Sequence, residues 1–174
     1  MTEAHKKVKD ALRIAGDIQK DVRVRLDPPD EGQASQTDSL IPKALVRGTR
    51  GYIERVSNQA NGCYERGWYD ACAVMVRRLL ETLIIEAFEH HKIGHTIQGA
   101  DGEYVFLKDL IAAALNEKSW ALGRATKPAL GKLKTIGDQS AHSRRFVATR
   151  QDIDKLAPEL RIVVQEFIYL AALK

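Results

Sequence analysis

A carboxylate and an imidazole stand four residues apart in the segment 133–142, as Asp138 and His142. If a helix continues through Gly137, the two side chains lie one turn apart on the same face. A carboxylate beside an imidazole raises the pKa of the ring and fixes its orientation, as general acid–base catalysis requires. If the helix ends at Gly137 instead, Asp138 caps the next turn and His142 satisfies a buried backbone group. The sequence leaves both interpretations open.

A second group of charges interrupts the most apolar part of the chain, the helix predicted over 67–91. Apolar side chains, Trp68 and Cys72 among them, cover about half of this helix when residues are projected at about 100° each. Arg77, Arg78 and Glu81 break the other half. Glu81 is spaced to pair with either arginine, and the result is either a surface ion pair or a polar pocket. A pocket gains weight if these charges face the segment 133–142.

Basic residues surround the histidine of the segment 133–142. Lys134 precedes it, and Arg144 and Arg145 follow it, in the densest positive cluster near any histidine of the chain. Such a cluster can receive the phosphates of a nucleic acid, although a solvated basic turn has the same composition. Because no aromatic residues are interleaved with these charges, we do not expect bases to stack on an aromatic platform here.

Other chemistries find little support in the sequence. His90, His91 and His95 cluster near the end of the helix 67–91, but no further ligand completes a set, so we expect no metal site. Glycine-rich phosphate loops and dinucleotide fingerprints are missing, and we expect no cofactor. Cys63 and Cys72 do not form a zinc-binding pair and are predicted to be reduced thiols.

Composition indicates an ordinary globular chain. Its 174 residues carry a formal net charge of +4, with 44% hydrophobic and 29% charged residues. That charge permits a nucleic-acid partner without requiring one. No apolar run approaches the roughly 20 residues that span a bilayer, and the N-terminus shows no signal-peptide pattern. We therefore expect no membrane contact and a cytoplasmic location.

Helical periodicity runs through most of the chain, and no alternation typical of strands is sustained. We predict an N-terminal helix or arm over 1–26, a linker over 27–41 that contains prolines and acidic residues, and a helical body over 42–174. The fold class is all-α, an antiparallel bundle of five to six helices. The helices of the body are predicted over 42–62 (with Pro42 in the first turn and Asn61-Gly62 as the stop), 67–91, 105–117, from 126 (with Thr126 as the cap), and from 149 (with Thr149 and Asp152 as a capping box).

Three of these segments together resemble a known family. They are Val76-Arg-Arg-Leu-Leu-Glu81, the segment 107–111, and Leu133-Lys-Thr-Ile-Gly-Asp-Gln-Ser-Ala-His142, followed by a helix with a threonine cap. The pattern resembles an uncharacterised bacterial domain of the HEPN superfamily over roughly residues 45–172. The resemblance implies a small helical bundle that dimerises, and a place in bacterial defence or stress systems with RNA or a protein as partner.

The resemblance also bears on catalysis. Active members of the superfamily are metal-independent RNases with an arginine four to six residues before a histidine, whereas others only bind or assemble. His142 matches the histidine, but the positions four to six residues before it hold Asp138, Gly137 and Ile136. The sequence therefore favours a HEPN-like binding or assembly module. The alternative is a metal-independent endoribonuclease that uses His142, with Asp138 orienting the ring and a nearby arginine stabilising phosphate charge.

Overall fold

The structure is a computed structural model that describes residues 13–14 and 39–174. The predicted helix over 1–26, apart from residues 13–14, and the linker over 27–38 lie outside the described residues. Described residues form no named strand, only one isolated bridge between Gln98 and Tyr104. From residue 39 onward the helices are α2 (Lys43–Val46), α3 (Gly51–Glu65), α4 (Tyr69–His90), the 3-10 helix η2 (Gly94–Ile97), α5 (Leu107–Asn116), α6 (Thr126–His142) and α7 (Arg150–Leu170).

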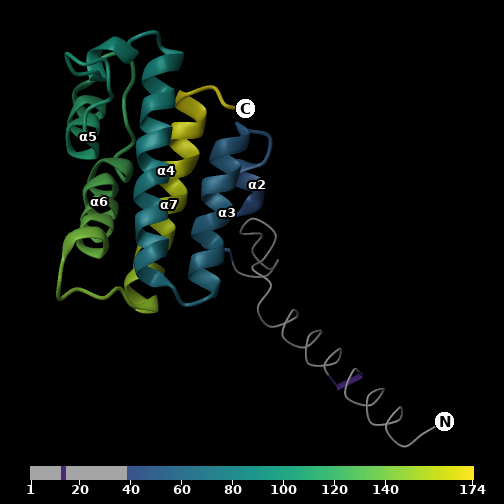
Figure 1. Cartoon of the computed structure of the whole chain (residues 1–174). Helices are drawn as coiled ribbons and strands as arrows, with labels where there is room; N and C mark the ends of the chain where they lie inside the picture. Colours follow the sequence, from purple (N-terminus) through teal and green to yellow (C-terminus); the bar gives the residue numbers. More distant parts are fainter. Residues whose placement is uncertain (1–12, 15–38) are drawn as a thin grey trace, which may run out of the picture. The chain divides into compact units, whose positions relative to one another are not determined.

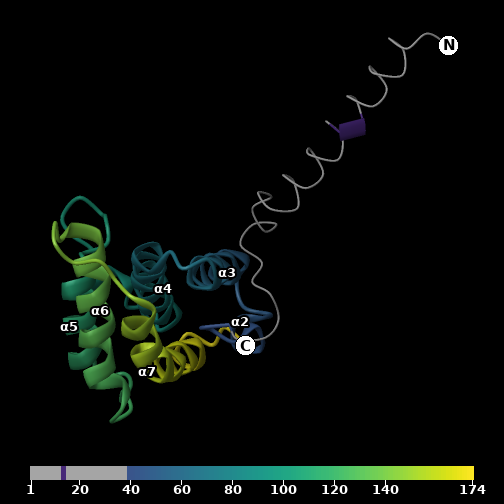
Figure 2. The same cartoon turned by 90° about the horizontal axis from the view of Figure 1, so that it is seen from below.

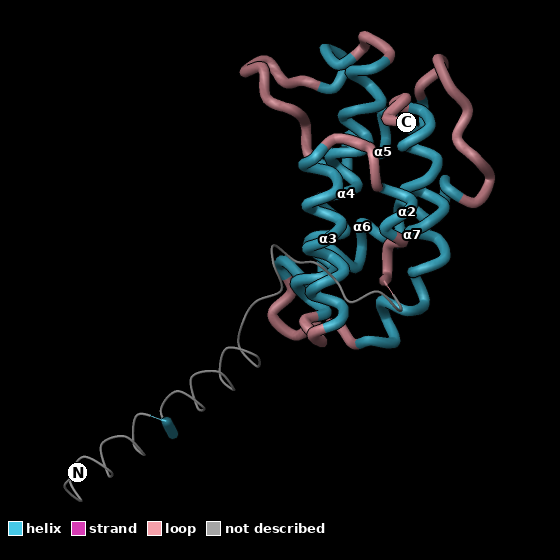
Figure 3. Tube along the Cα trace, turned by 90° about the vertical axis from the view of Figure 1, so that its right-hand side faces the viewer, coloured by secondary structure: helices cyan, strands magenta, loops and turns pink. Residues whose placement is uncertain are grey.

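Three long helices form the centre of this body, and two others cross one flank. In Figure 1, α4 stands between α3 and the pair α5 and α6, with α7 beside it. Seen from below, α3, α4 and α7 are viewed nearly end-on, whereas α5 and α6 are viewed from the side (Figure 2). The connecting loops gather at the two ends of the bundle (Figure 3).

The prediction of an antiparallel bundle is only partly right. α3 and α4 form an antiparallel hairpin, but α4 and α7 run in the same direction. Their first turns meet where Asp70 accepts a hydrogen bond from the Ala148 amide at 3.0 Å, and their last turns meet where His91 lies 3.2 Å from the Leu170 carbonyl. The reason is that α5 and α6 carry the chain back to the lower end, so α7 starts beside the beginning of α4.

α4 is the central helix, as its apolar composition predicted. Ten of its residues are buried, including Leu79, Leu80, Leu83 and Phe88. Trp68 is an exception, because it precedes the helix and 56% of it is exposed. The guanidinium carbon of Arg66 lies 5.4 Å from the centre of the Trp68 ring.

The prediction of one helix over 42–62 is wrong at both ends. The chain breaks after α2 because Gly48 adopts a φ of +83°, which favours glycine, and α3 then starts at Gly51. Asn61 does not stop α3, which continues to Glu65. The Asn61 amide is instead buried and exchanges two hydrogen bonds of 2.8 Å with the backbone of Ile41. These bonds hold Ile41 in the core, although the sequence placed it in the linker.

The starts of α6 and α7 differ in how they are fixed. The capping box at Thr149 and Asp152 is confirmed, with both reciprocal bonds present. Thr126 is not a cap: its hydroxyl is buried and bonds to Glu166 of α7, which also accepts from the Gly123 amide at 2.6 Å. A residue from α7 therefore secures the first turn of α6.

The closest approach between α6 and α4 lies at Gly137. A Cβ atom built there would stand 2.7 Å from the Cβ of Arg77 and 3.2 Å from the carbonyl oxygen of Ala73. Neither atom is the end of a flexible side chain, so only glycine fits this crossing. α6 therefore passes over α4 with its backbone almost in contact.

None of the described helices combines the length and apolar character that crossing a membrane requires.

We expect Gly137→Ala to lower the free energy of unfolding by about 1–3 kcal/mol, because the added methyl overpacks the crossing. Gly131→Ala in the same helix is the matched control, since no atom lies within 4 Å of its added Cβ. That change should raise stability by about 0.5–1 kcal/mol through helix propensity. Urea unfolding followed by circular dichroism measures both. Equal effects of the two substitutions would contradict the close crossing.

Candidate functional site

α6 continues through Gly137 and ends at His142, so Asp138 and His142 lie one helical turn apart. The first of the two interpretations of this segment therefore describes the backbone. The two side chains, however, are in different environments. Asp138 is half-buried against α4, whereas His142 is exposed in the last turn of α6.

Asp138 belongs to an ion network that joins α6 to α4. Arg77 donates from Nε to one carboxylate oxygen at 3.0 Å, and Lys134 donates to the other oxygen. Arg77 also pairs with Glu81, with its guanidinium 3.1 Å from a carboxylate oxygen. All four side chains are 25–31% exposed, so the network lies at the edge of the helix interface.

The network decides the ionisation of Asp138. Burial is the largest single influence and raises the pKa of its carboxyl, but the hydrogen bonds and charges of Lys134 and Arg77 together outweigh it and lower the pKa. Asp138 is thus a carboxylate at neutral pH with both oxygens occupied. Among the described residues no hydrogen bond joins it to His142, so it does not orient the ring.

The other predicted site residues lie apart from this network. Arg78 is exposed, and its backbone carbonyl accepts a hydrogen bond from the Thr82 hydroxyl. Arg144 and Arg145 are exposed in the loop after α6. Ser143 shapes that loop, since its hydroxyl accepts from the amides of Arg145 and Phe146. The structure thus gathers Arg77, Glu81, Lys134 and Asp138 into one network and leaves His142 and the two loop arginines at the lower end.

Sequence reasoning missed a second buried charge. Glu86 of α4 is only 7% exposed, and it accepts from Arg50 Nε at 2.7 Å and from the Tyr52 hydroxyl. A glutamate amid the apolar residues of α4 was the available signal, since such a charge is stable only when paired. This group ties the start of α3 to α4.

The histidine cluster near the end of α4 and the two cysteines lie outside the network around Asp138. His91 packs 4.9 Å from the Trp120 ring, and the described residues contain no group of three or more potential ligands that could hold a metal ion. Burial raises the pKa of the Cys72 thiol to about 12 and also raises that of Cys63. Both cysteines are therefore protonated thiols at neutral pH and poor nucleophiles.

Comparison with known proteins found no protein-family model, curated protein or solved structure that matches the chain.

We expect Asp138→Asn to destabilise the fold by about 1–2 kcal/mol at pH 7, because two charged donors lose their acceptor. The carboxyl has a lower pKa in the folded chain than its ordinary value of 3.8, so it stabilises the fold above that pH. The contribution disappears as pH falls through the folded pKa. The stability difference between wild type and Asp138→Asn should therefore shrink between pH 7 and pH 3 in urea unfolding.

A double-mutant cycle separates the ion pair from general effects. Arg77→Met keeps the aliphatic stem that packs on Gly137 and removes the charge. A coupling energy near zero between Arg77→Met and Asp138→Asn would contradict the proposed network.

Proposed function

We propose that this chain is a non-catalytic, HEPN-like binding module that contacts RNA through the basic end of α6. The basic end is defined as His142, Arg144 and Arg145. The observation that carries the proposal is the division of charges around Asp138. Lys134 and Arg77 both pair with Asp138 where α6 packs on α4. The residues of the basic end are exposed and form no ion pair within the described part of the chain.

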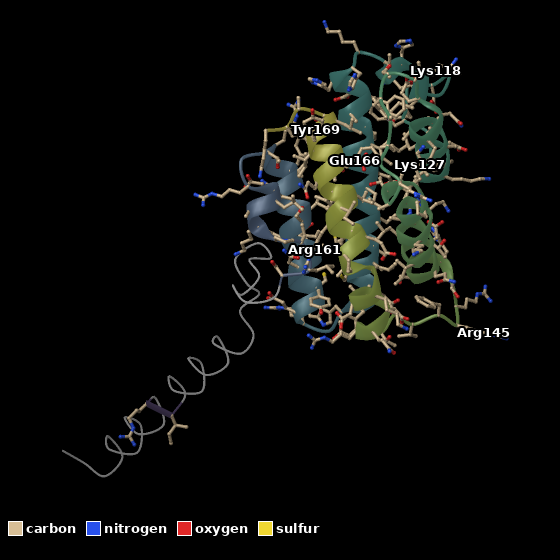
Figure 4. All side chains as sticks on the ribbon, turned by 180° about the vertical axis from the view of Figure 1, so that it is seen from behind. Lys118, Lys127, Arg145, Arg161, Glu166 and Tyr169 are labelled. Carbon is tan, nitrogen blue, oxygen red and sulfur yellow. The ribbon has the colours of Figure 1, made fainter. Side chains whose placement is uncertain are left out.

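Electrostatics supports a phosphate partner for the basic end. Two adjacent arginines and a histidine at the end of a helix attract phosphates, and each phosphate neutralised releases counterions. Figure 4 shows Arg145 extending from the lower corner of the body.

An exposed aromatic side chain at the same end strengthens the proposal. Trp68 directly precedes α4, and Asp70 in the first turn of that helix accepts a hydrogen bond from the Ala148 amide in the segment between α6 and α7. Trp68 is therefore positioned near the end of the bundle that carries the loop arginines, with Arg66 against its ring. Bases stack on such rings with little sequence preference.

The second candidate is a metal-independent endoribonuclease that uses His142. One observation favours it: His142 is exposed, close to the loop arginines, and free to accept a proton from a ribose 2′-hydroxyl. Two observations oppose it, since Asp138 does not orient the ring and the nearest network arginine, Arg77, is bound to two carboxylates. A place in a bacterial defence or stress system, a homodimeric state and a protein partner are proposed on the resemblance alone.

We expect the double substitution Arg144→Glu and Arg145→Glu to abolish tight binding of single-stranded RNA at low salt. If both arginines contact phosphates, removing them lowers the log–log salt slope by about 1.4, at about 0.7 for each contact. Fluorescence anisotropy across a salt series measures the affinity and the slope. Lys118→Glu with Lys127→Glu is the control, because it changes the charge equally and these residues lie away from Arg145 (Figure 4). Equal loss in both variants would argue against a defined site.

We expect no RNA cleavage by wild type or by His142→Ala when a mixed RNA pool is incubated with a metal chelator and examined on a gel. His142→Ala should remain folded, because the side chain is exposed. Cleavage by wild type that disappears in His142→Ala would overturn the non-catalytic proposal and establish the endoribonuclease.

A further inference from the structure

An open groove of about 580 Å³ runs between α6 and the first turns of α7. Its floor is apolar, formed by buried Ile136 with half-buried Phe146 and Leu156. Ile136 and Leu156 also border the small crevice beneath, which reaches core residues such as Leu133 and Leu160. The floor of the groove is thus the outer edge of the hydrophobic core.

A glycine keeps the groove open along α6. Gly131 faces it, and an added Cβ there would meet no atom within 4 Å. Pro128 and Gln139 mark its extent on α6, and the 11 steps from one to the other span roughly 16 Å at 1.5 Å per residue. Its walls are exposed along this length, at Lys132, Thr135 and Gln139. A long, open groove suits a helical segment of another protein better than a small molecule, which usually needs an enclosing pocket.

The charges around the groove determine whether an acidic or a basic segment binds there. Two acidic residues lie among four basic ones, Lys132, Lys155 and the two loop arginines: Glu159 pairs with Lys132 at 2.6 Å, and Asp152, which caps α7 through Thr149, stays ionised and interacts with the charge of Lys155. Lys155 lines the groove and forms no ion pair within the described part of the chain. Arg144 and Arg145 directly precede Phe146 at the end of the groove. The surroundings are therefore positive around an apolar floor.

We propose that this groove binds an acidic amphipathic helix of a protein partner. The apolar face of that helix, with anchors spaced i, i+3 and i+7, lies on Ile136, Phe146 and Leu156. Its acidic flanks meet Lys155 and the two loop arginines. This site shares the two loop arginines with the RNA contact proposed above and differs from it in its apolar floor, where the main contacts lie between the helices.

The probe is a displayed library of 12-residue helical peptides with leucines fixed at the anchor positions and either glutamate or lysine elsewhere. Selection on the full chain should enrich glutamate-rich peptides. Their affinity, measured by fluorescence polarisation, should fall at least tenfold with Gly131→Phe, which fills the groove, and with Lys155→Glu. Gly131→Ala and Lys127→Glu are the matched controls and should retain binding. Thermal unfolding by circular dichroism checks that each variant is folded.

Several outcomes overturn the proposal. They are no enrichment on wild type, enrichment of lysine-rich peptides, or binding that survives Gly131→Phe. If sedimentation shows concentration-dependent self-association and Gly131→Phe abolishes it, the occupant of the groove is a second copy of this chain instead. Loss of RNA binding with Gly131→Phe would give it to RNA. Because Arg144→Glu with Arg145→Glu removes charges that both sites use, Gly131→Phe separates the two proposals: it should abolish peptide binding and leave RNA binding unchanged.

Discussion

The contact between Gly137 of α6 and Arg77 of α4 governs how the rest of this fold is arranged. Because residue 137 has no Cβ, the α6 backbone approaches the stem of Arg77 and the carbonyl of Ala73. This approach brings the next residue, Asp138, to the Arg77 guanidinium and fixes how α6 lies across α4. α6 continues for one turn beyond this crossing and ends at His142, which is exposed with the two loop arginines that follow it.

The ion network at this crossing explains why Asp138, in a segment whose composition suggested an active site, instead holds two helices together. A carboxylate at a helix interface loses hydration, and it stays charged only where cations replace the lost water. Lys134 from its own helix and Arg77 from the neighbouring helix do so. Each therefore has less capacity to bind a ligand. The charges left for a partner are those beyond the end of the helix, where no carboxylate neutralises them.

Local patterns in the sequence were sufficient for the helices and insufficient for the site. Periodicity predicted the central helix, and the Thr149 capping box needed only residues within one turn. The continuation of α3 past Asn61 depended on a partner far along the chain, Ile41, which lies 20 residues from Asn61. Asp138 is the clearest case. Its predicted partner was four residues away, whereas its main cross-helix partner is 61 residues away and is fixed by the crossing.

The two glycines of α6, Gly131 and Gly137, have opposite effects on packing within a single helix. Gly137 lies six positions after Gly131, which places the two about 120° apart around the axis. Gly137 lets α6 approach its neighbour, and Gly131 leaves open space above an apolar floor. By propensity alone both simply weaken the helix. In the structure, substitutions on one face of α6 test the packing of the bundle, whereas those on the other face test what the bundle binds. Stability and binding can therefore be separated within this one helix.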